Sequence, residues 1–223
     1  MEIQKESKMQ HRKTQIWPSI MAQSQTELNA QLATAKQVSP VVHLDFVDGR
    51  FANNKVLQFP FILKRGLEYS AHLMLQKPLP FIKKHKHRIQ LFIPHFEVFA
   101  DPQKYVSFCK KEQIVTAFAV LPQTNVTKIK TVLRDLDYLL ILTVKPGFYG
   151  SKFQKSQVKK IAQVKKYIQQ HNLHTQIIVD GAMNPEHLTL CKQAGANIFV
   201  SGSYLMKSSN VKRAMKELQY AAK

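Results

Sequence analysis

Eight short stretches rich in aliphatic and β-branched residues alternate with segments of helical periodicity along this 223-residue chain. Several stretches are nearly continuous in apolar residues, which is typical of parallel strands that are buried on both faces. The expected strands are residues 15–19, 41–45, 68–74, 89–93, 115–120, 139–144, 176–180 and 197–201. This alternation predicts an α/β fold with a parallel sheet, either an open doubly wound sheet or a closed eightfold barrel.

The segments between the expected strands carry helix signals. Residues 156–171 repeat apolar side chains at helical spacing, with lysines on the opposite face. Asn184-Pro185 and Asp101-Pro102 predict helix starts, because Asn and Asp cap helices and proline suits the first helical position. We therefore expect one barrel domain over residues 15–223, ending in a helix at 211–222, and a flexible N-terminal tail at residues 1–14.

The formal net charge is +19, which produces a field that attracts phosphate esters and nucleic acids alike. The densest basic cluster, residues 83–88, is typical of a solvated helix end, and no zinc-finger or RNP pattern accompanies it. No apolar run reaches the roughly 18 residues of a membrane helix. Cys109 and Cys191 lie far apart, without CxxC spacing, as in a reducing compartment. We expect a cytoplasmic protein without a nucleic-acid or membrane partner.

Polar side chains stand at the carboxyl ends of four expected strands. Ser19 ends the first strand, His43 and Asp45 end the second, His72 lies in the third, and Asp180 ends the seventh. Residues two apart in a strand share a face, so His43 and Asp45 are expected to point the same way. In a closed barrel all five would converge at the carboxyl-terminal mouth. Two imidazoles and two carboxylates suit one divalent cation, such as zinc, iron, manganese or cobalt.

The segment His43-Leu44-Asp45-Phe46-Val47-Asp48-Gly49 resembles the H-x-D-x-M-D-G signature of ribulose-phosphate 3-epimerases. Further blocks that resemble this family follow in matching order from about residue 15 to about residue 205. They are Pro18-Ser19-Ile20, Ala71-His72-Leu73-Met74, Thr143-Val144-Lys145-Pro146-Gly147-Phe148, Val179-Asp180-Gly181 and Ser201-Gly202-Ser203. The resemblance implies a single (β/α)8 TIM barrel of the ribulose-phosphate-binding type, which selects the closed alternative.

The resemblance also implies the chemistry. His43, Asp45, His72 and Asp180 would be the metal ligands, with Asp45 and Asp180 as the acid–base pair and Ser19 hydrogen-bonded beside them. The implied reaction is the metal-dependent interconversion of D-ribulose 5-phosphate and D-xylulose 5-phosphate at C3 through a cis-enediolate, a step of the pentose phosphate pathway. The family also implies a homo-oligomer.

A phosphorylated ketose must be held by the loops that follow the strands, where glycine turns offer backbone N–H groups. The expected substrate-binding residues are Ser19, His72, Met74, Gly147, Phe148, Gly150, Gly181, Ala182, Gly202 and Ser203.

The chain departs from the family pattern in these loops. Tyr149 and Ser151 replace Gly and Gln of the P-G-F-G-G-Q block, and Ala182 replaces the second glycine of V-D-G-G. If that glycine has positive φ, alanine there costs about 1 kcal/mol. Val47 and Leu142 stand where methionine is usual. The departures leave two alternatives open: a 3-epimerase of another ketose phosphate, such as allulose 6-phosphate, or a weakly active paralogue that serves as a binding protein.

Overall fold

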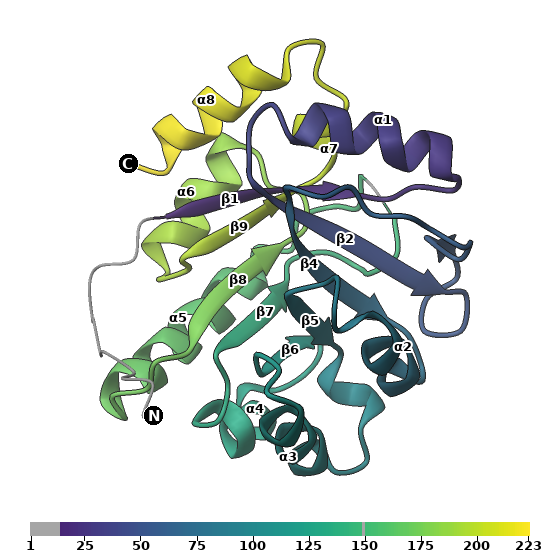
Figure 1. The fold of residues 1–223 in the computed structure, drawn as a ribbon. Coiled ribbons are helices and arrows are strands. Elements are labelled where there is room, and N and C mark those ends of the chain that lie inside the picture. The colour runs from purple at the N-terminus through teal and green to yellow at the C-terminus, as the bar shows by residue number, and fades with distance from the viewer. Residues whose placement is uncertain (1–13, 149) are drawn as a thin grey trace, which may run out of the picture.

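The computed structural model describes residues 14–148 and 150–223, which form a closed barrel of parallel strands (Figure 1). Neighbouring strands pair in the order β5-β4-β2-β1-β9-β8-β7-β6, and one parallel bridge between His95 and Ala119 joins the two ends. The strands are β1 (Gln15–Ile20), β2 (Val41–Asp48), β4 (Glu68–Met74), β5 (Leu91–Pro94), β6 (Ala117–Val120), β7 (Tyr138–Leu142), β8 (Gln176–Asp180) and β9 (Ile198–Ser201). The predicted barrel is therefore confirmed.

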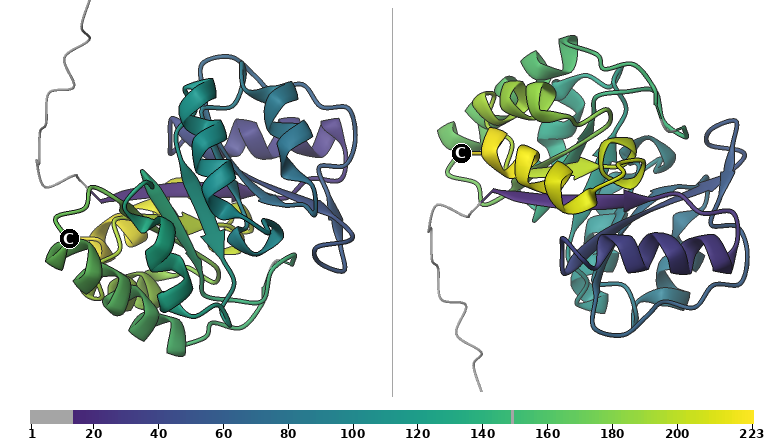
Figure 2. Two further views of the ribbon diagram at one scale, coloured as in Figure 1. Left: turned by 90° about the horizontal axis from the view of Figure 1, so that it is seen from below. Right: turned by 90° about the horizontal axis from the view of Figure 1, so that it is seen from above.

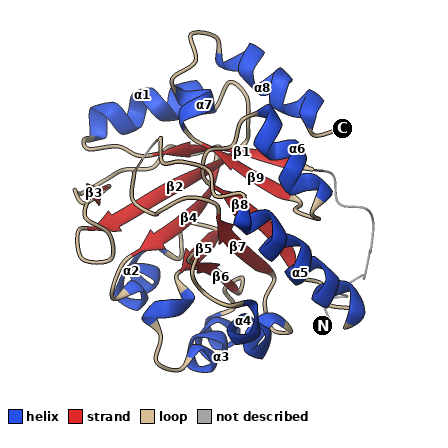
Figure 3. Ribbon diagram, turned by 180° about the vertical axis from the view of Figure 1, so that it is seen from behind, coloured by secondary structure: helices blue, strands red, loops and turns tan. Residues whose placement is uncertain are grey.

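Helices surround the strands on the outside of the barrel (Figures 2 and 3). The helices are α1 (Gln25–Ala35), α2 (Pro78–His85), α3 (Pro102–Glu112), α4 (Val126–Leu133), α5 (Ser156–Gln170), α6 (Pro185–Gln193), α7 (Ser203–Met206), α8 (Val211–Ala221) and the 3-10 helix η1 (Phe96–Val98). The two predicted helix starts are confirmed, because Asp101 and Asn184 accept backbone N–H bonds as N-caps of α3 and α6. The basic residues 83–88 span the last turn of α2 and the turn that follows it, as expected.

Alternation along each strand divides the apolar core into two parts. In β8, Ile178 packs in one cluster with Leu140 and Val200 of the neighbouring strands, whereas Ile177 and Val179 pack in the larger cluster that includes the helices. The smaller cluster fills the barrel, because residues two apart share a face. Asp180 follows Ile178 on this inner face, which directs its carboxylate into the barrel mouth.

The structure extends β2 beyond the expected strand end at residue 45, and the extension pairs antiparallel with a short strand, β3 (Lys55–Val56). The sequence pattern missed β3 because two residues carry no periodicity. The expected strands 89–93 and 115–120 begin two residues later, at Leu91 and Ala117, and the strand expected at 139–144 ends at Leu142. An apolar run indicates which residues are buried, but buried residues can lie beyond the end of a hydrogen-bonded strand. Thr143 and Val144, for example, are buried but lie outside any strand.

Apart from Thr14, the expected tail at residues 1–14 lies outside the described residues, and so does Tyr149. Within the part of the chain that the structure describes, the helices are too short or too polar to cross a membrane.

Candidate active site

Barrel closure brings the predicted polar side chains together at the carboxyl ends of the strands. Ser19, His43, Asp45 and His72 come from three adjacent strands, in which Ser19 is in register with His43, and Asp45 with His72. Asp180 comes from β8, which the strand order separates from β4 by β2, β1 and β9. Asp180 and His72 can therefore meet only across the interior of the barrel.

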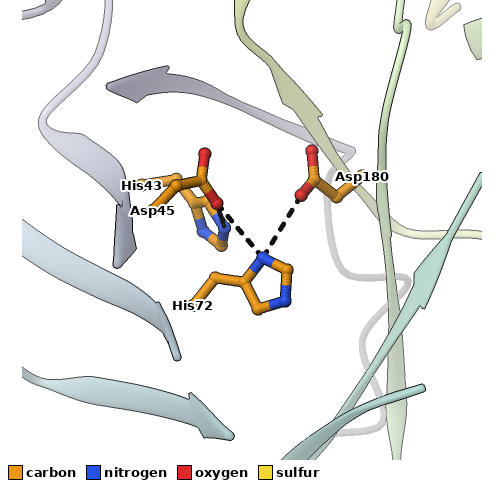
Figure 4. Close-up of side chains that lie close together, drawn as sticks. All are labelled: His43, Asp45, His72 and Asp180. Carbon is orange, nitrogen blue, oxygen red and sulfur yellow. Dashed lines mark hydrogen bonds and ion pairs between the residues drawn. The ribbon is translucent and has the colours of Figure 1, made fainter. Parts of the chain in front are cut away.

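The two carboxylates approach one nitrogen of His72 from different sides (Figure 4). His72 Nδ1 lies 3.1 Å from Asp45 Oδ1 and 3.5 Å from Asp180 Oδ2. His43 Nε2 lies 3.7 Å from the same Asp45 oxygen. One ligand atom from each of the four residues lies within 4.8 Å of all the others. A donor set of this size and composition is able to hold a metal ion.

The surroundings of His43 support a metal site. Its Nδ1 lies 3.1 Å from Ser70 Oγ, but its Nε2 is buried and has no hydrogen-bond partner among the described residues. Leaving a buried polar atom unsatisfied costs about 1–3 kcal/mol, so such atoms usually have a partner. The free Nε2 points at the carboxylate cluster, where a bound cation would satisfy it. The residues present therefore fit a divalent metal ion.

The cluster shifts the protonation equilibria of its members. Burial would lower the pKa of His72, but hydrogen bonds and charges of Asp180 and Asp45 outweigh burial and raise this pKa to about 9. For His43, burial dominates and the pKa falls below 6.5. Burial would raise the pKa of Asp45, yet the two imidazoles and the Ser19 hydroxyl lower it. Of these three ligands, only His72 carries a proton at neutral pH that a metal ion must displace.

Ser19 holds the Asp45 carboxylate in a fixed orientation. Its hydroxyl donates to Asp45 Oδ2 at 2.5 Å, which leaves Oδ1 facing both histidines. The hydrogen bond expected beside the ligands is present.

Two residues behind the cluster escaped the sequence reasoning. His72 Nε2 lies 2.9 Å from His95 Nε2, and His95 Nδ1 lies 3.2 Å from Glu97 Oε2. His95 directly follows β5, and Glu97 lies two residues further on, in η1. His43 and Asp45 were predicted from the same two-residue spacing next to an apolar strand. The sequence therefore contained a signal that could have identified His95 and Glu97.

A pocket opens above the cluster, and the predicted substrate-binding residues line it together. These are Ser19, His72, Met74, Gly147, Phe148, Gly150, Gly181, Ala182, Gly202 and Ser203. Asp45 and Asp180 line the same pocket, whereas His43 lies deeper and does not. Met21 and Lys145, which the prediction omitted, also contribute to its wall. Hence both proposed bases face the space in which a small molecule would bind.

The loop after β8 shows how the chain accommodates its departure from the family pattern. Gly181 has φ +118°, and a Cβ there would lie 2.5 Å from Val144 Cγ2, so glycine is required. Ala182 has φ +52°, the left-handed conformation in which alanine carries the predicted cost. His187 Nδ1 donates to the Ala182 carbonyl at 2.6 Å, and its ring stacks on Phe153 at 3.9 Å between centroids. These contacts hold the strained turn against the loop after β7.

Comparisons with known proteins agree with this architecture. The model of the ribulose-phosphate 3 epimerase family matches residues 15–206. A ribulose-phosphate 3-epimerase of Bacillus subtilis is 30% identical over 210 residues, which cover 91% of this chain and 96% of the relative. One of Methanocaldococcus jannaschii is 29% identical over 212 residues, covering 93% and 90%.

Solved structures share the fold at low sequence identity. KGPDC from Streptococcus mutans superposes with a TM-score of 0.61 at 7% identity, covering 95% of this chain and 98% of that one. Thiamine phosphate pyrophosphorylase from Pyrococcus furiosus gives a TM-score of 0.59 at 8% identity, covering 94% and 95%. The long family match and the site geometry confirm the resemblance seen in the sequence: the chain belongs to the ribulose-phosphate 3-epimerase family, a family of isomerases.

Proposed function

We propose that this protein interconverts D-ribulose 5-phosphate and D-xylulose 5-phosphate by inverting the configuration at C3. The observation that carries the proposal is the placement of Asp45 and Asp180, which face one pocket from opposite parts of the barrel and meet at His72. The names of the relatives support the choice of substrate.

Inversion next to a carbonyl needs two acid–base groups on opposite faces of the substrate. One carboxylate removes the C3 proton, and the electron pair passes to the C2 oxygen to form an enediolate. The other carboxylate, as its carboxylic acid, returns a proton to the opposite face of C3. Asp45 and Asp180 exchange these roles in the reverse direction. In this proposal Ser19, which donates to Asp45, keeps that carboxylate oriented through the cycle.

His43, Asp45, His72 and Asp180 would hold one divalent cation, and zinc, iron, manganese and cobalt all suit this donor set. When bound, the cation would act as a Lewis acid that stabilises negative charge on the substrate oxygens. Burial of His43 and His72 excludes water from the metal-binding side of the pocket.

The loops after β8 and β9 are proposed to hold the phosphate. Gly181, Ala182, Gly202 and Ser203 line the pocket there, and turns of this kind present backbone N–H groups to anions. The net charge of +19 favours the approach of a phosphate ester.

Metal-loaded protein tests the proposal directly. D-xylulose 5-phosphate should form from D-ribulose 5-phosphate with at least one of the four metals, and absence of turnover with all of them would refute the assignment. Asp180→Asn should abolish exchange of the C3 proton with solvent from at least one epimer. Asp135→Asn, which removes a surface carboxylate paired with Lys110, is the matched control and should leave exchange unchanged.

A second candidate, supported by two residues of the pocket, is epimerisation of a six-carbon ketose phosphate such as allulose 6-phosphate. Ser151 and Ala182 both depart from the family pattern and both line the pocket. A higher kcat/KM for the six-carbon sugar would favour it, and a clear preference for ribulose 5-phosphate would reject it. If neither sugar turns over, the alternative of a binding paralogue gains support. Assembly into a homo-oligomer and a cytoplasmic location stay predictions.

A further inference from the structure

We propose that His95 and Glu97 are positioning residues that hold His72 in the one tautomer able to bind a cation through Nδ1. The proposal rests on the proposed metal site and adds to it a hydrogen-bonded chain, His72–His95–Glu97, in which both histidines are buried and Glu97 is exposed. Its first link joins β4 to the residue after β5.

The first link requires one donor and one acceptor. His72 Nε2 and His95 Nε2 lie 2.9 Å apart, a hydrogen-bond distance, so one nitrogen carries the proton and the other offers a lone pair. A metal ion needs the lone pair of His72 Nδ1, which faces Asp45 and Asp180. The His72 proton must then be on Nε2, and His95 must accept it.

The second link sets the direction of the first. Once His95 Nε2 accepts, the proton of this imidazole is on Nδ1, from which it donates to Glu97 Oε2 at 3.2 Å. A carboxylate can only accept, so it enforces this arrangement. The effect resembles the carboxylate–histidine–metal triad, with one additional imidazole between the carboxylate and the ligand.

Glu97 is itself fixed. Its Oε1 accepts from the backbone N–H of Leu121 at 2.9 Å and from the Thr124 hydroxyl. Burial opposes the charge on Glu97, but these donors and His95 lower the pKa of the carboxyl. One oxygen of the carboxylate therefore accepts hydrogen bonds from the loop after β6, and the other accepts a hydrogen bond from His95.

The link between His72 and His95 is shielded from solvent. His72 and His95 are both fully buried, and the ring of Phe51 packs on His95 with its centroid 4.3 Å away. Water is therefore excluded as a substitute for the His72–His95 hydrogen bond, whereas Glu97 at the other end of the chain is exposed. Loss of a group that orients a metal ligand typically weakens metal binding by about 10- to 100-fold.

The sharpest test is Glu97→Gln. This substitution keeps the shape of the side chain but replaces a carboxylate, which only accepts hydrogen bonds, with an amide that also donates. The Leu121 N–H cannot reverse, so the glutamine oxygen should stay with it and the NH2 group should face His95 Nδ1. His95 must then accept at Nδ1 and donate from Nε2, which forces the His72 proton onto Nδ1. We expect zinc affinity to fall by about 10- to 100-fold.

Nitrogen-15 NMR of the imidazole rings reports the tautomers independently of activity. Zinc-loaded wild type should carry protons on His72 Nε2 and His95 Nδ1, and Glu97→Gln should move the His95 proton to Nε2. Glu112→Gln, which removes a carboxylate paired with Lys86 at the surface, should change neither tautomer nor affinity. Wild-type zinc affinity and tautomers in Glu97→Gln would overturn the proposal.

Two further variants keep the test decisive if Glu97→Gln does not fold. His95→Gln places an amide that can accept from His72 and donate to Glu97, so it should retain zinc affinity within a few-fold. His95→Leu cannot accept and should lose about 10- to 100-fold. Equal affinities in these two variants would contradict the proposed role. A wild type that binds zinc but epimerises with none of the four metals would refute only the proposed reaction, and one that binds none of the four metals would refute both.

Discussion

The raised pKa of His72 makes metal affinity depend on pH in a calculable way. In the metal-free protein, Asp45 and Asp180 raise this pKa to about 9, so His72 keeps a proton on the nitrogen that a cation needs. The pKa of His43 lies below 6.5, so this ligand is largely neutral already above that pH. At lower pH, protons therefore compete with the metal ion for His72 Nδ1. The affinity of the site for metal should fall as the pH falls.

The size of the effect follows from this single proton. With a pKa of about 9, raising the pH from 6.5 to 8.5 should increase apparent affinity about 80-fold, equivalent to about 2.6 kcal/mol. With the ordinary pKa of 6.5, the same change would be about twofold. Above about pH 9 the affinity should level off, because His72 has then lost its proton.

Zinc competition against a chelating indicator, with the indicator calibrated at each pH, measures this dependence. The control is His174→Asn, which changes an exposed histidine outside the site and should leave the slope unchanged. A twofold change between pH 6.5 and pH 8.5 would refute the reasoning, because His72 would then not be held protonated by the two carboxylates.

Two substitutions test the framework of the site through the free energy of unfolding, measured in urea. Gly181→Ala should cost at least about 2 kcal/mol, because its Cβ would lie 2.5 Å from Val144 Cγ2 at positive φ. Gly66→Ala, where a Cβ meets nothing within 4 Å, should cost less, and equal costs would argue against the steric reason. Lys160→Met should cost about 1–3 kcal/mol, because the buried ammonium donates to two backbone carbonyls of the β6–α4 loop. An unchanged midpoint of urea unfolding in Lys160→Met would show that these hydrogen bonds make no net contribution to stability.

Much of the site was predictable because the strands of a barrel are recognisable from local sequence patterns. His43 and Asp45 stand two apart after an apolar run, which is sufficient to predict a shared inner face. Asn184 predicted the start of the helix that follows β8, and its side chain caps that helix in the structure. The condition under which alanine at position 182 would carry a cost is met, since φ of Ala182 is +52°.

The features that escaped prediction depend on contacts between distant segments. Nothing in the spacing of His72 and His95 indicates that their Nε2 atoms meet, because this requires the pairing of β4 with β5. The stacking of His187, in α6, on Phe153, in the loop after β7, likewise depends on tertiary packing alone. Periodicity predicts which face is buried, and the structure is needed to show which buried groups are partners.

The central claim is that four residues of this barrel form one metal centre, and crystallography with anomalous scattering tests it most directly. Crystals of protein loaded with cobalt should show a single anomalous peak at the carboxyl-terminal mouth. The peak should contact His43 Nε2, His72 Nδ1 and a carboxylate oxygen of both Asp45 and Asp180. A fully loaded crystal in which the peak lies elsewhere, or in which any of the four side chains turns away from it, would contradict the account.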